Sequence, residues 1–336
     1  YASITSFTFL PALIAPAIAP FLGGVILDSI GWRWVFVFSG PICLVLAIVS
    51  MFVLRETFHQ NKRPLDLMGF ISSSAILIAI FYGLSELAES GWSLKTLIPF
   101  ALIFPLLWLF IRTEKKQTHP LIDLSFFKRK FFRSANLIQL CFQSCHLGAI
   151  FLVSLFLQAG IGFSAILAGL MMGMQAVGAM MTSRYSVYLY KKHGATLPIK
   201  IGLLGVAIIS PMIMLINKPS LLWLGLLLFL VRGIFSGLCG TPIQTLSVVD
   251  FDKKEISSIN SIFNACRQVS ISLGVATSSL FIAFGMYMTG VTGTIIPKHQ
   301  VFNVFIYGFI AIPIIACIGI WLTSRLDHAR QGLLDV

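Results

Sequence analysis

The sequence predicts an all-α membrane protein with about ten transmembrane helices, and three observations support this. Of the 336 residues, 57% are hydrophobic and only 11% are charged, whereas a soluble domain carries about 25% charged residues. The apolar residues gather in runs that match the roughly 20 residues a helix needs to cross the hydrocarbon core. None of the runs has the alternating pattern of a barrel strand.

Ten runs are expected to be these helices, because helices and closed barrels alone satisfy their backbone polar groups in lipid. The fourth and sixth runs are short, and the ninth is long enough to begin outside the membrane. In order, the runs are Ser6–Leu27, Trp34–Leu54, Leu67–Leu84, Leu97–Ile111, Ala135–Leu157, Ala165–Met181, Pro198–Ile216, Leu221–Leu246, Ile256–Tyr287 and Val301–Thr323.

The basic residues predict how the chain is oriented. Seventeen Lys and Arg residues follow even-numbered runs and four follow odd-numbered runs. Because short loops with Lys and Arg are retained in the cytoplasm, both ends of this chain are predicted to be cytoplasmic, in an integral plasma (inner) membrane protein that crosses the bilayer many times. The net charge of +12 therefore reflects topology, and we expect no nucleic-acid partner.

Several chemical functions have no motif in this sequence. The six cysteines lie in apolar runs without metal-ligand spacing, and neither a phosphate-binding glycine loop nor a serine elbow is present. We therefore expect no enzyme, no metal and no cofactor. The twelve acidic residues lie in loops or at the edges of runs, although a proton-coupled transporter normally needs a carboxylate within the membrane.

The first run is interrupted by Pro16, Pro20, Gly23 and Gly24. Proline bends a helix and glycine lets a second helix approach closely. This segment is predicted to bend and to pack tightly against a neighbour.

The fifth run has a polar stripe. Asn136, Gln139, Gln143 and His146 follow one another at helical spacing, which places them on one face. This face is predicted to line a cavity and bind substrate, because polar groups in spans usually face a bundle interior or water. The alternative is hydrogen bonding between helices. His146 is either a proton carrier or a structural histidine.

The eighth run carries a cation at mid-span. Arg232 and Ser236 share a face, and Gln244 follows two turns later. An intramembrane arginine normally lines a cavity or pairs with a polar group, so these three residues join the predicted substrate site.

The ninth and sixth runs supply two further candidates. Asn264, Arg267 and Gln268 lie on one face near the cytoplasmic end, where they are predicted to form a gate or to bond between helices. The sixth run, around Gly169–Met174, is rich in glycine and methionine, which suits either an adaptable pocket or simple gap filling.

The longest connection, Arg112–Ser134, contains Pro120 and then a stretch of aromatic and basic residues. Pro120 is expected to stop the preceding helix. The stretch after it is either an amphipathic segment at an anionic lipid surface or a solvated linker.

Several segments together resemble a known family. They are Ala15–Gly24, Gly31–Phe36, Gly40-Pro41, Asp66–Gly69, Glu89–Trp92, Pro120–Leu124 and Asn264–Gly274. The first is similar to the antiporter motif in the fifth helix of major facilitator drug exporters, except that Ala15 and Ala19 stand where the family has glycine. The set is similar to the fourteen-span drug:proton antiporter branch, the EmrB/QacA type.

The resemblance implies a major facilitator fold that lacks its first four helices, which carry the family's first-helix aspartate and fourth-helix arginine. The implied division has five parts. They are the last two helices of the N-terminal bundle (1–54), two additional helices (55–111), a cytoplasmic linker (112–134), the C-terminal six-helix bundle (135–323) and a cytoplasmic tail (324–336).

The function implied is proton-coupled efflux of amphipathic or cationic drugs by alternating access, in which one bundle rocks against the other. The implied partners are a small-molecule substrate, protons and the lipid bilayer, with a periplasmic adaptor as a further candidate. Two alternatives stay open. In the first, the protein is an exporter of an endogenous anionic metabolite such as a siderophore, and Arg232 would pair with the anionic group. In the second, the protein is a membrane remnant or scaffold that transports nothing.

Overall fold

A computed structural model describes residues 2–53, 66–91, 93–117, 123–252, 255–291 and 296–326. In these residues the regular secondary structure is helical throughout, which confirms the predicted fold class. Within the same residues nine helices are long and apolar enough to cross a membrane, and the segment Ile14–Ile30 adds a shorter apolar helix. The predicted motif residues Trp92 and Pro120, and positions 55–65 and 327–336, lie outside the described residues.

Each of the ten predicted runs corresponds to a helix or to a succession of helices. Along the chain they are α1 (Ala2–Ile30), α2 (Trp32–Val53), α3 (Leu67–Ser90), α4 (Leu94–Lys116), α5 (Lys130–Gln143), α6 (Ala149–Leu155), α7 (Ala165–His193), α8 (Thr196–Met212), α9 (Leu222–Val248), α10 (Ile256–Thr289) and α11 (Val301–Ser324).

The helices extend beyond the apolar runs. The sixth run was predicted to end at Met181, whereas α7 continues to His193. Backbone hydrogen bonds continue past the last apolar residue, and Lys191, Lys192 and His193 occupy the last turn of α7, where cations interact favourably with the helix dipole.

The fifth run is not one regular α-helix. It comprises α5, the π-helix η2 (Ser144–Gly148), α6 and a second π-helix, η3 (Phe156–Ile161). Together these form a continuous span, Lys130–Ile161. Hydropathy alone could not reveal the π segments, because it does not report the hydrogen-bond pattern of the backbone.

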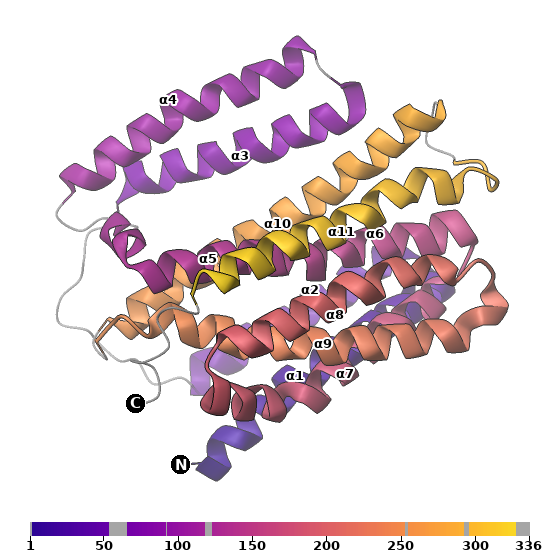
Figure 1. The fold of residues 1–336 in the computed structure, drawn as a ribbon, viewed down its shortest axis with the longest axis horizontal. Helices are drawn as coiled ribbons and strands as arrows, with labels where there is room; N and C mark the ends of the chain where they lie inside the picture. The colour runs from indigo at the N-terminus through magenta and orange to yellow at the C-terminus, as the bar shows by residue number, and fades with distance from the viewer. Residues whose placement is uncertain are drawn as a thin grey trace.

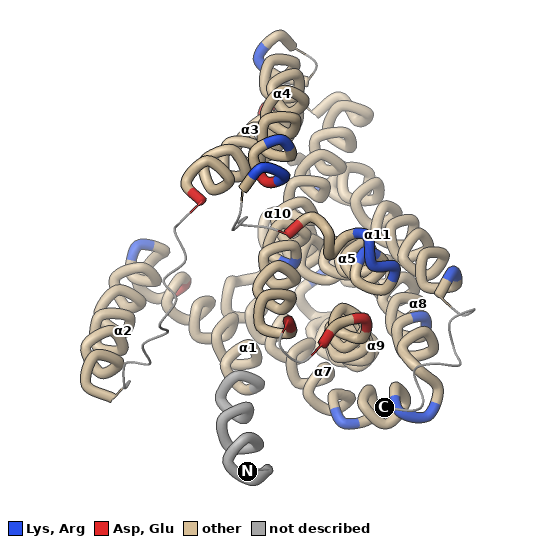
Figure 2. The backbone as a smooth tube through the Cα atoms, turned by 90° about the vertical axis from the view of Figure 1, so that its left-hand side faces the viewer, with Lys and Arg blue, Asp and Glu red and all other residues tan. Residues whose placement is uncertain are grey.

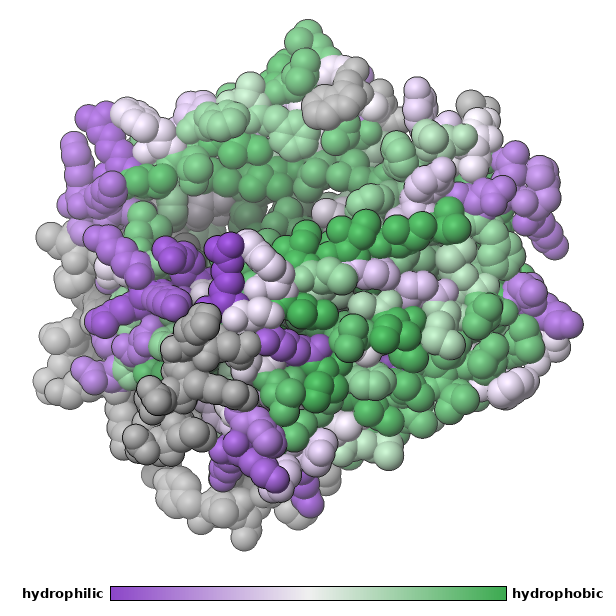
Figure 3. All heavy atoms as spheres, viewed as in Figure 1, coloured by the Kyte–Doolittle hydropathy of each residue, from purple (hydrophilic) through white to green (hydrophobic). Residues whose placement is uncertain are grey.

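The span Lys130–Ile161 and helices α7 to α11 form a six-helix bundle (Figure 1). Helix α9 packs against α7, α8 and α5, and α11 packs against α8, α10 and α5. Two apolar clusters fill the interior, one around Phe156 and Phe309 and the other around Phe132 and Ile243. The face in Figure 3 shows a broad apolar band between hydrophilic ends, as a membrane-spanning bundle requires.

Four helices lie outside the six-helix bundle. Helices α3 and α4 pair with each other, and α3 contacts α10. Helix α1 packs along α7, while α2 contacts α1 and none of its described residues is buried. Figure 2 shows α2 standing apart from the bundle.

The connection after α4 folds back onto the bundle. A 3-10 helix, η1 (Leu124–Lys128), precedes α5. The ring centroid of Phe126 lies 5.3 Å from that of Phe251, and the rings of Phe127 and Phe132 are 5.1 Å apart. The aromatic half of the predicted amphipathic stretch therefore packs on protein, while its basic residues are exposed.

Candidate functional site

The polar stripe of the fifth run is more buried than a fully open cavity wall would be. Gln139 is 3% exposed and Gln143 is 7% exposed, while Asn136 and His146 are half-buried. The amide of Asn136 donates to the carbonyl of Phe132 on its own helix, 2.8 Å away. The imidazole of His146 stacks on Phe142, with 5.3 Å between the ring centroids.

Two side chains of this stripe have a buried oxygen without a hydrogen-bond partner in the described residues. They are Asn136, through Oδ1, and Gln143, through Oε1. A buried acceptor without a partner costs about 1–3 kcal/mol. Such a group is therefore suited to bind a donor that enters the site.

The π-helix η2 begins directly after Gln143. A π segment disturbs the regular i to i−4 hydrogen bonds and leaves backbone carbonyls that need other donors; such segments often occur at functional sites. Ser278 of α10 supplies one donor, since its hydroxyl lies 2.9 Å from the carbonyl of Gly148. Gly274 of α10 packs directly on this turn, because a Cβ there would lie 2.7 Å from the Cα of Ser144.

Arg232 of α9 supplies the other donors. Its Nη2 donates to the carbonyl of Cys145, at 2.7 Å, and to that of His146, at 3.3 Å. Its Nε donates to the hydroxyl of Ser210 on α8, at 3.0 Å, and its Nη1 donates to Oε1 of Gln175 on α7. One side chain therefore joins four helical segments of the bundle.

The surroundings of Arg232 are neutral. The side chain is fully buried, and none of its four acceptors is a carboxylate. A buried cation without hydrogen bonds is very unfavourable, and here the carbonyl, amide and hydroxyl oxygens offset part of that cost. Arg232 thus positions the π turn that carries His146.

Sequence reasoning missed Gln175. It is 3% exposed, and besides accepting from Arg232 it brings its Nε2 to 3.4 Å from Nδ1 of His146. The sequence feature that could have identified it is a polar amide side chain within the otherwise apolar, glycine- and methionine-rich run. Gln175 therefore links Arg232 to the ring of His146.

The remaining predicted residues of α9 and α10 occupy two environments. Ser236 is buried and donates to the carbonyl of Gly233 on its own helix, at 3.0 Å. Gln244 and the predicted gate residues Asn264, Arg267 and Gln268 are all exposed. The structure therefore does not bring the whole predicted set to one point. In the described residues no group of three His, Cys, Asp or Glu side chains converges on a metal position.

Glycines join α7 to α9. A Cβ on Gly178 would lie 2.9 Å from the nitrogen of Ile234, and a Cβ on Gly233 would lie 2.8 Å from the carbonyl carbon of Gln175. Hydroxyl groups cross the same contact, since Thr182 donates to the carbonyl of Ile234 and Ser186 to that of Leu238, each at 2.9 Å. The glycines of this run therefore serve close packing.

The opposite face of α7 packs on α1. A Cβ on Gly24 would lie 2.7 Å from the carbonyl carbon of Ala165, and a Cβ on Gly169 would lie 2.8 Å from that of Pro20. Gly23 would meet no atom within 4 Å, and Pro16 is exposed. Of the predicted motif residues, Pro20 and Gly24 therefore form the closest contacts with α7.

Asp28 closes this contact at the end of α1, and sequence reasoning missed its role. Its carboxylate accepts the backbone N–H of Ala165, at 3.2 Å, and that of Ile166, at 2.9 Å. These are orphan donors of the first turn of α7. A carboxylate from a distant helix thus caps α7, and the sequence separation of this pair left no local signal.

The comparisons with known proteins agree with this architecture. The sequence profile of the Major Facilitator Superfamily matches residues 2–275. Proteins named "Putative multidrug resistance protein MdtD" are similar to this chain in Salmonella newport (strain SL254) and Salmonella typhimurium (strain LT2), both at 28% identity, and in Salmonella heidelberg (strain SL476), at 27% identity. Each alignment covers 98% of this chain and 70% of the relative.

Proposed function

The chain belongs to the major facilitator superfamily, and on that basis we propose that this membrane transporter is a proton-coupled exporter of amphipathic or cationic drugs. The drug substrate is supported by the name of the relatives, "Putative multidrug resistance protein MdtD". Proton coupling is supported by the resemblance of Ala15–Gly24 to the antiporter motif of drug:proton exporters.

The observation that best supports this proposal is the position of α7 between two unlike partners. On one side α7 is tied to α9 by glycines, hydroxyl groups and Arg232. On the other side α1 contacts α7 through backbone packing and the Asp28 cap. Alternating access requires one bundle to rock against another, and the α1–α7 contact is the seam along which we expect this movement.

The proposed parts follow from that seam. Helices α1 and α2 belong to the N-terminal bundle, α3 and α4 are additional helices, and the six-helix bundle is the C-terminal half. Positive residues mark the cytoplasmic end of an inner-membrane protein, so the Asp28 cap lies at the outer end of the seam.

The proposed substrate contacts begin at the π turn. Gln143 offers a buried acceptor without a partner among the described residues, and His146 is half-buried beside it. The exposed side chains Gln244, Asn264 and Gln268 are further proposed contacts, nearer the cytoplasmic ends of α9 and α10. Within this proposal Arg232 is a positioning residue, because each of its three nitrogens already donates a hydrogen bond to the protein.

The same bonds disfavour the metabolite alternative. For Arg232 to pair with an anionic metabolite, hydrogen bonds to Cys145, His146, Ser210 and Gln175 would have to break. Export of a carboxylate would therefore need a different cation.

The test is efflux of a lipophilic cation such as ethidium from cells that express the protein. We expect lower ethidium accumulation than in cells without it, and loss of that difference when a protonophore collapses the proton gradient. Equal accumulation with and without the protein contradicts export of cationic drugs. Efflux that persists after the gradient has collapsed contradicts proton coupling.

A further inference from the structure

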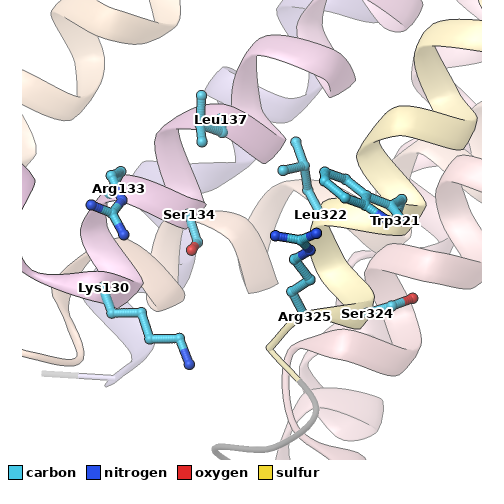
Figure 4. A pocket seen from close by; sticks show the side chains of 8 residues that line it. All are labelled: Lys130, Arg133, Ser134, Leu137, Trp321, Leu322, Ser324 and Arg325. Atoms are coloured by element: carbon cyan, nitrogen blue, oxygen red, sulfur yellow. The ribbon is translucent and has the colours of Figure 1, made fainter.

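A basic groove lies between the ends of α5 and α11, far from the π turn. Its volume is about 590 Å³, which is within the usual range for pockets that bind small molecules. Lys130 and Arg133 come from the first turn of α5, while Trp321 and Arg325 come from the end of α11 (Figure 4). None of the eight described residues that line the groove is acidic.

Close packing further along the two helices creates the groove. A Cβ on Gly319 of α11 would lie 3.1 Å from Cβ of Cys141 on α5, so the helices touch there. The groove lies between their charged ends, and Figure 4 shows the guanidinium of Arg325 on the α11 side of it, beside Trp321.

The cations are available for an anion. The side chains of Lys130, Arg133 and Arg325 are exposed, and no hydrogen bond or ion pair joins any of them to another described residue. The guanidinium carbon of Arg325 lies 3.9 Å from the ring centroid of Trp321. This cation–π contact orients the guanidinium while leaving its N–H groups free to bind oxygen atoms.

The apolar wall of the groove faces the membrane. Leu137 is 43% exposed and Trp321 is 53% exposed, and both belong to helices that are long and apolar enough to span the bilayer. Tryptophan is enriched at the level of lipid headgroups. Three cations at the end of an apolar wall match a molecule with an anionic head and an apolar tail.

We propose that this groove binds the phosphate headgroup of an anionic phospholipid from the same leaflet. The phosphate lies among Lys130, Arg133 and Arg325, and the acyl chains follow Leu137 and Trp321 along the bundle. The bound lipid bridges the first and last helices of the six-helix bundle. This site is separate from the proposed transport site and does not depend on it.

The test measures lipid binding to the purified protein in a neutral detergent. Dioctanoyl phosphatidylglycerol, dioctanoyl phosphatidylcholine and inorganic phosphate are titrated separately, and the shift in thermal unfolding midpoint gives the apparent affinity. The variant K130Q/R133Q/R325Q removes the three cations. The matched control, R184Q/K191Q/K192Q, removes three exposed cations from the C-terminal part of α7.

We expect phosphatidylglycerol to bind the wild type and the control equally, and the groove variant about a hundredfold more weakly, since each cation near an anionic lipid contributes about 1 kcal/mol. Equal loss in both triple variants, or none in either, overturns the proposal. If phosphatidylcholine binds as tightly as phosphatidylglycerol, the groove does not select an anionic headgroup. If inorganic phosphate stabilises the protein as much as phosphatidylglycerol does, the ligand is free phosphate and not a lipid.

A second measurement locates the lipid even if the groove variant unfolds. Brominated phosphatidylglycerol should quench the fluorescence of the wild type more than that of W321F, because the acyl chains pass Trp321. Identical quenching of the two proteins overturns the proposed position.

Discussion

Helix α7 has two faces that contact their partners in different ways. Toward α9 it places Gly178 against the partner backbone, and Thr182, Ser186 and Gln175 add side-chain hydrogen bonds across the contact. Toward α1 it places Gly169 and Gly173 against the partner backbone. In the described residues the hydrogen bonds between these two helices are those that Asp28 accepts.

This difference indicates which contact can open. Buried hydrogen bonds distributed along α7 and α9 must all break before those helices separate, and each unpaired group costs free energy. The α1–α7 contact has its polar bonds at one end, and elsewhere the described side chains of the two helices share no hydrogen bond. We therefore expect the α7–α9 contact to be permanent and the α1–α7 seam to be the separable one.

The largest expected effect is on the α7–α9 side. Arg232→Met removes a donor from two π-turn carbonyls, from Ser210 and from Gln175, each of which then lacks its partner in a buried site. We expect the free energy of unfolding to fall by about 3 kcal/mol, measured as a lower thermal midpoint in detergent. Arg267→Met, at an exposed cation of α10, is the control and should leave the midpoint unchanged. An unaltered midpoint in the Arg232 variant contradicts its positioning role.

Adding one methyl group distinguishes the two faces of α7. Gly233→Ala forces a Cβ into the backbone of Gln175, and overpacking of this kind typically costs about 1–3 kcal/mol, so the thermal midpoint should fall. Gly24→Ala forces a Cβ into Ala165. It should push α1 away from α7, reducing ethidium efflux while leaving the six-helix bundle folded.

Gly23→Ala is the matched control, since no atom of the described residues lies within 4 Å of the added Cβ. Both efflux and thermal midpoint should match the wild type. If Gly24→Ala and Gly23→Ala have equal effects on efflux, the seam is not located at Gly24.

Asp28→Asn has a smaller expected effect, confined to the end of the seam. The loss of a charged cap weakens the first turn of α7 by about 1 kcal/mol. We expect the N–H groups of Ala165 and Ile166 to exchange with solvent deuterium about five times faster, as measured by hydrogen exchange. Unchanged protection in this turn would show that Asp28 does not hold it.

Gln143→Leu has the smallest expected effect on stability. The substitution removes the buried Oε1 acceptor, which already lacks a partner among the described residues, so no hydrogen bond of that oxygen is broken. The thermal midpoint should stay within the error of the wild type while ethidium efflux falls severalfold. Gln158→Leu, on the same span but bonded to Ser154 at 2.8 Å, should leave efflux unchanged. Unimpaired efflux in the Gln143 variant removes that residue from the proposed substrate site.

The helices could be predicted from sequence because length and hydropathy are local properties. The glycines of the first run also predicted close packing, which the structure shows for Gly24. For the sixth run an adaptable pocket or gap filling was predicted, whereas Gly169 packs against the backbone of α1. The π turn after Gln143 could not be predicted in this way, because its carbonyls are satisfied by Arg232 and Ser278, each far away in the sequence.

The same limit applies to Asp28 and Gln175. Asp28 is one of the twelve acidic residues in loops or at the edges of runs, and its partners lie more than a hundred residues later. Gln175 lay within a run whose glycines and methionines dominated the pattern. Both depend on which helices become neighbours, and the hydropathy of a single sequence does not determine that.

The most direct test compares, during transport, a distance across the α1–α7 seam with a distance inside the six-helix bundle. Spin labels on Ile30→Cys and Ala159→Cys report on the seam, and labels on Ala159→Cys and Lys218→Cys report on the six-helix bundle. All three positions are exposed, and the native cysteines Cys43, Cys266 and Cys317 are replaced to prevent labelling elsewhere. We expect ethidium and acidification to change the first distance distribution and leave the second unchanged. A first distance that stays fixed, or a second that changes equally, would contradict an opening seam between α1 and α7.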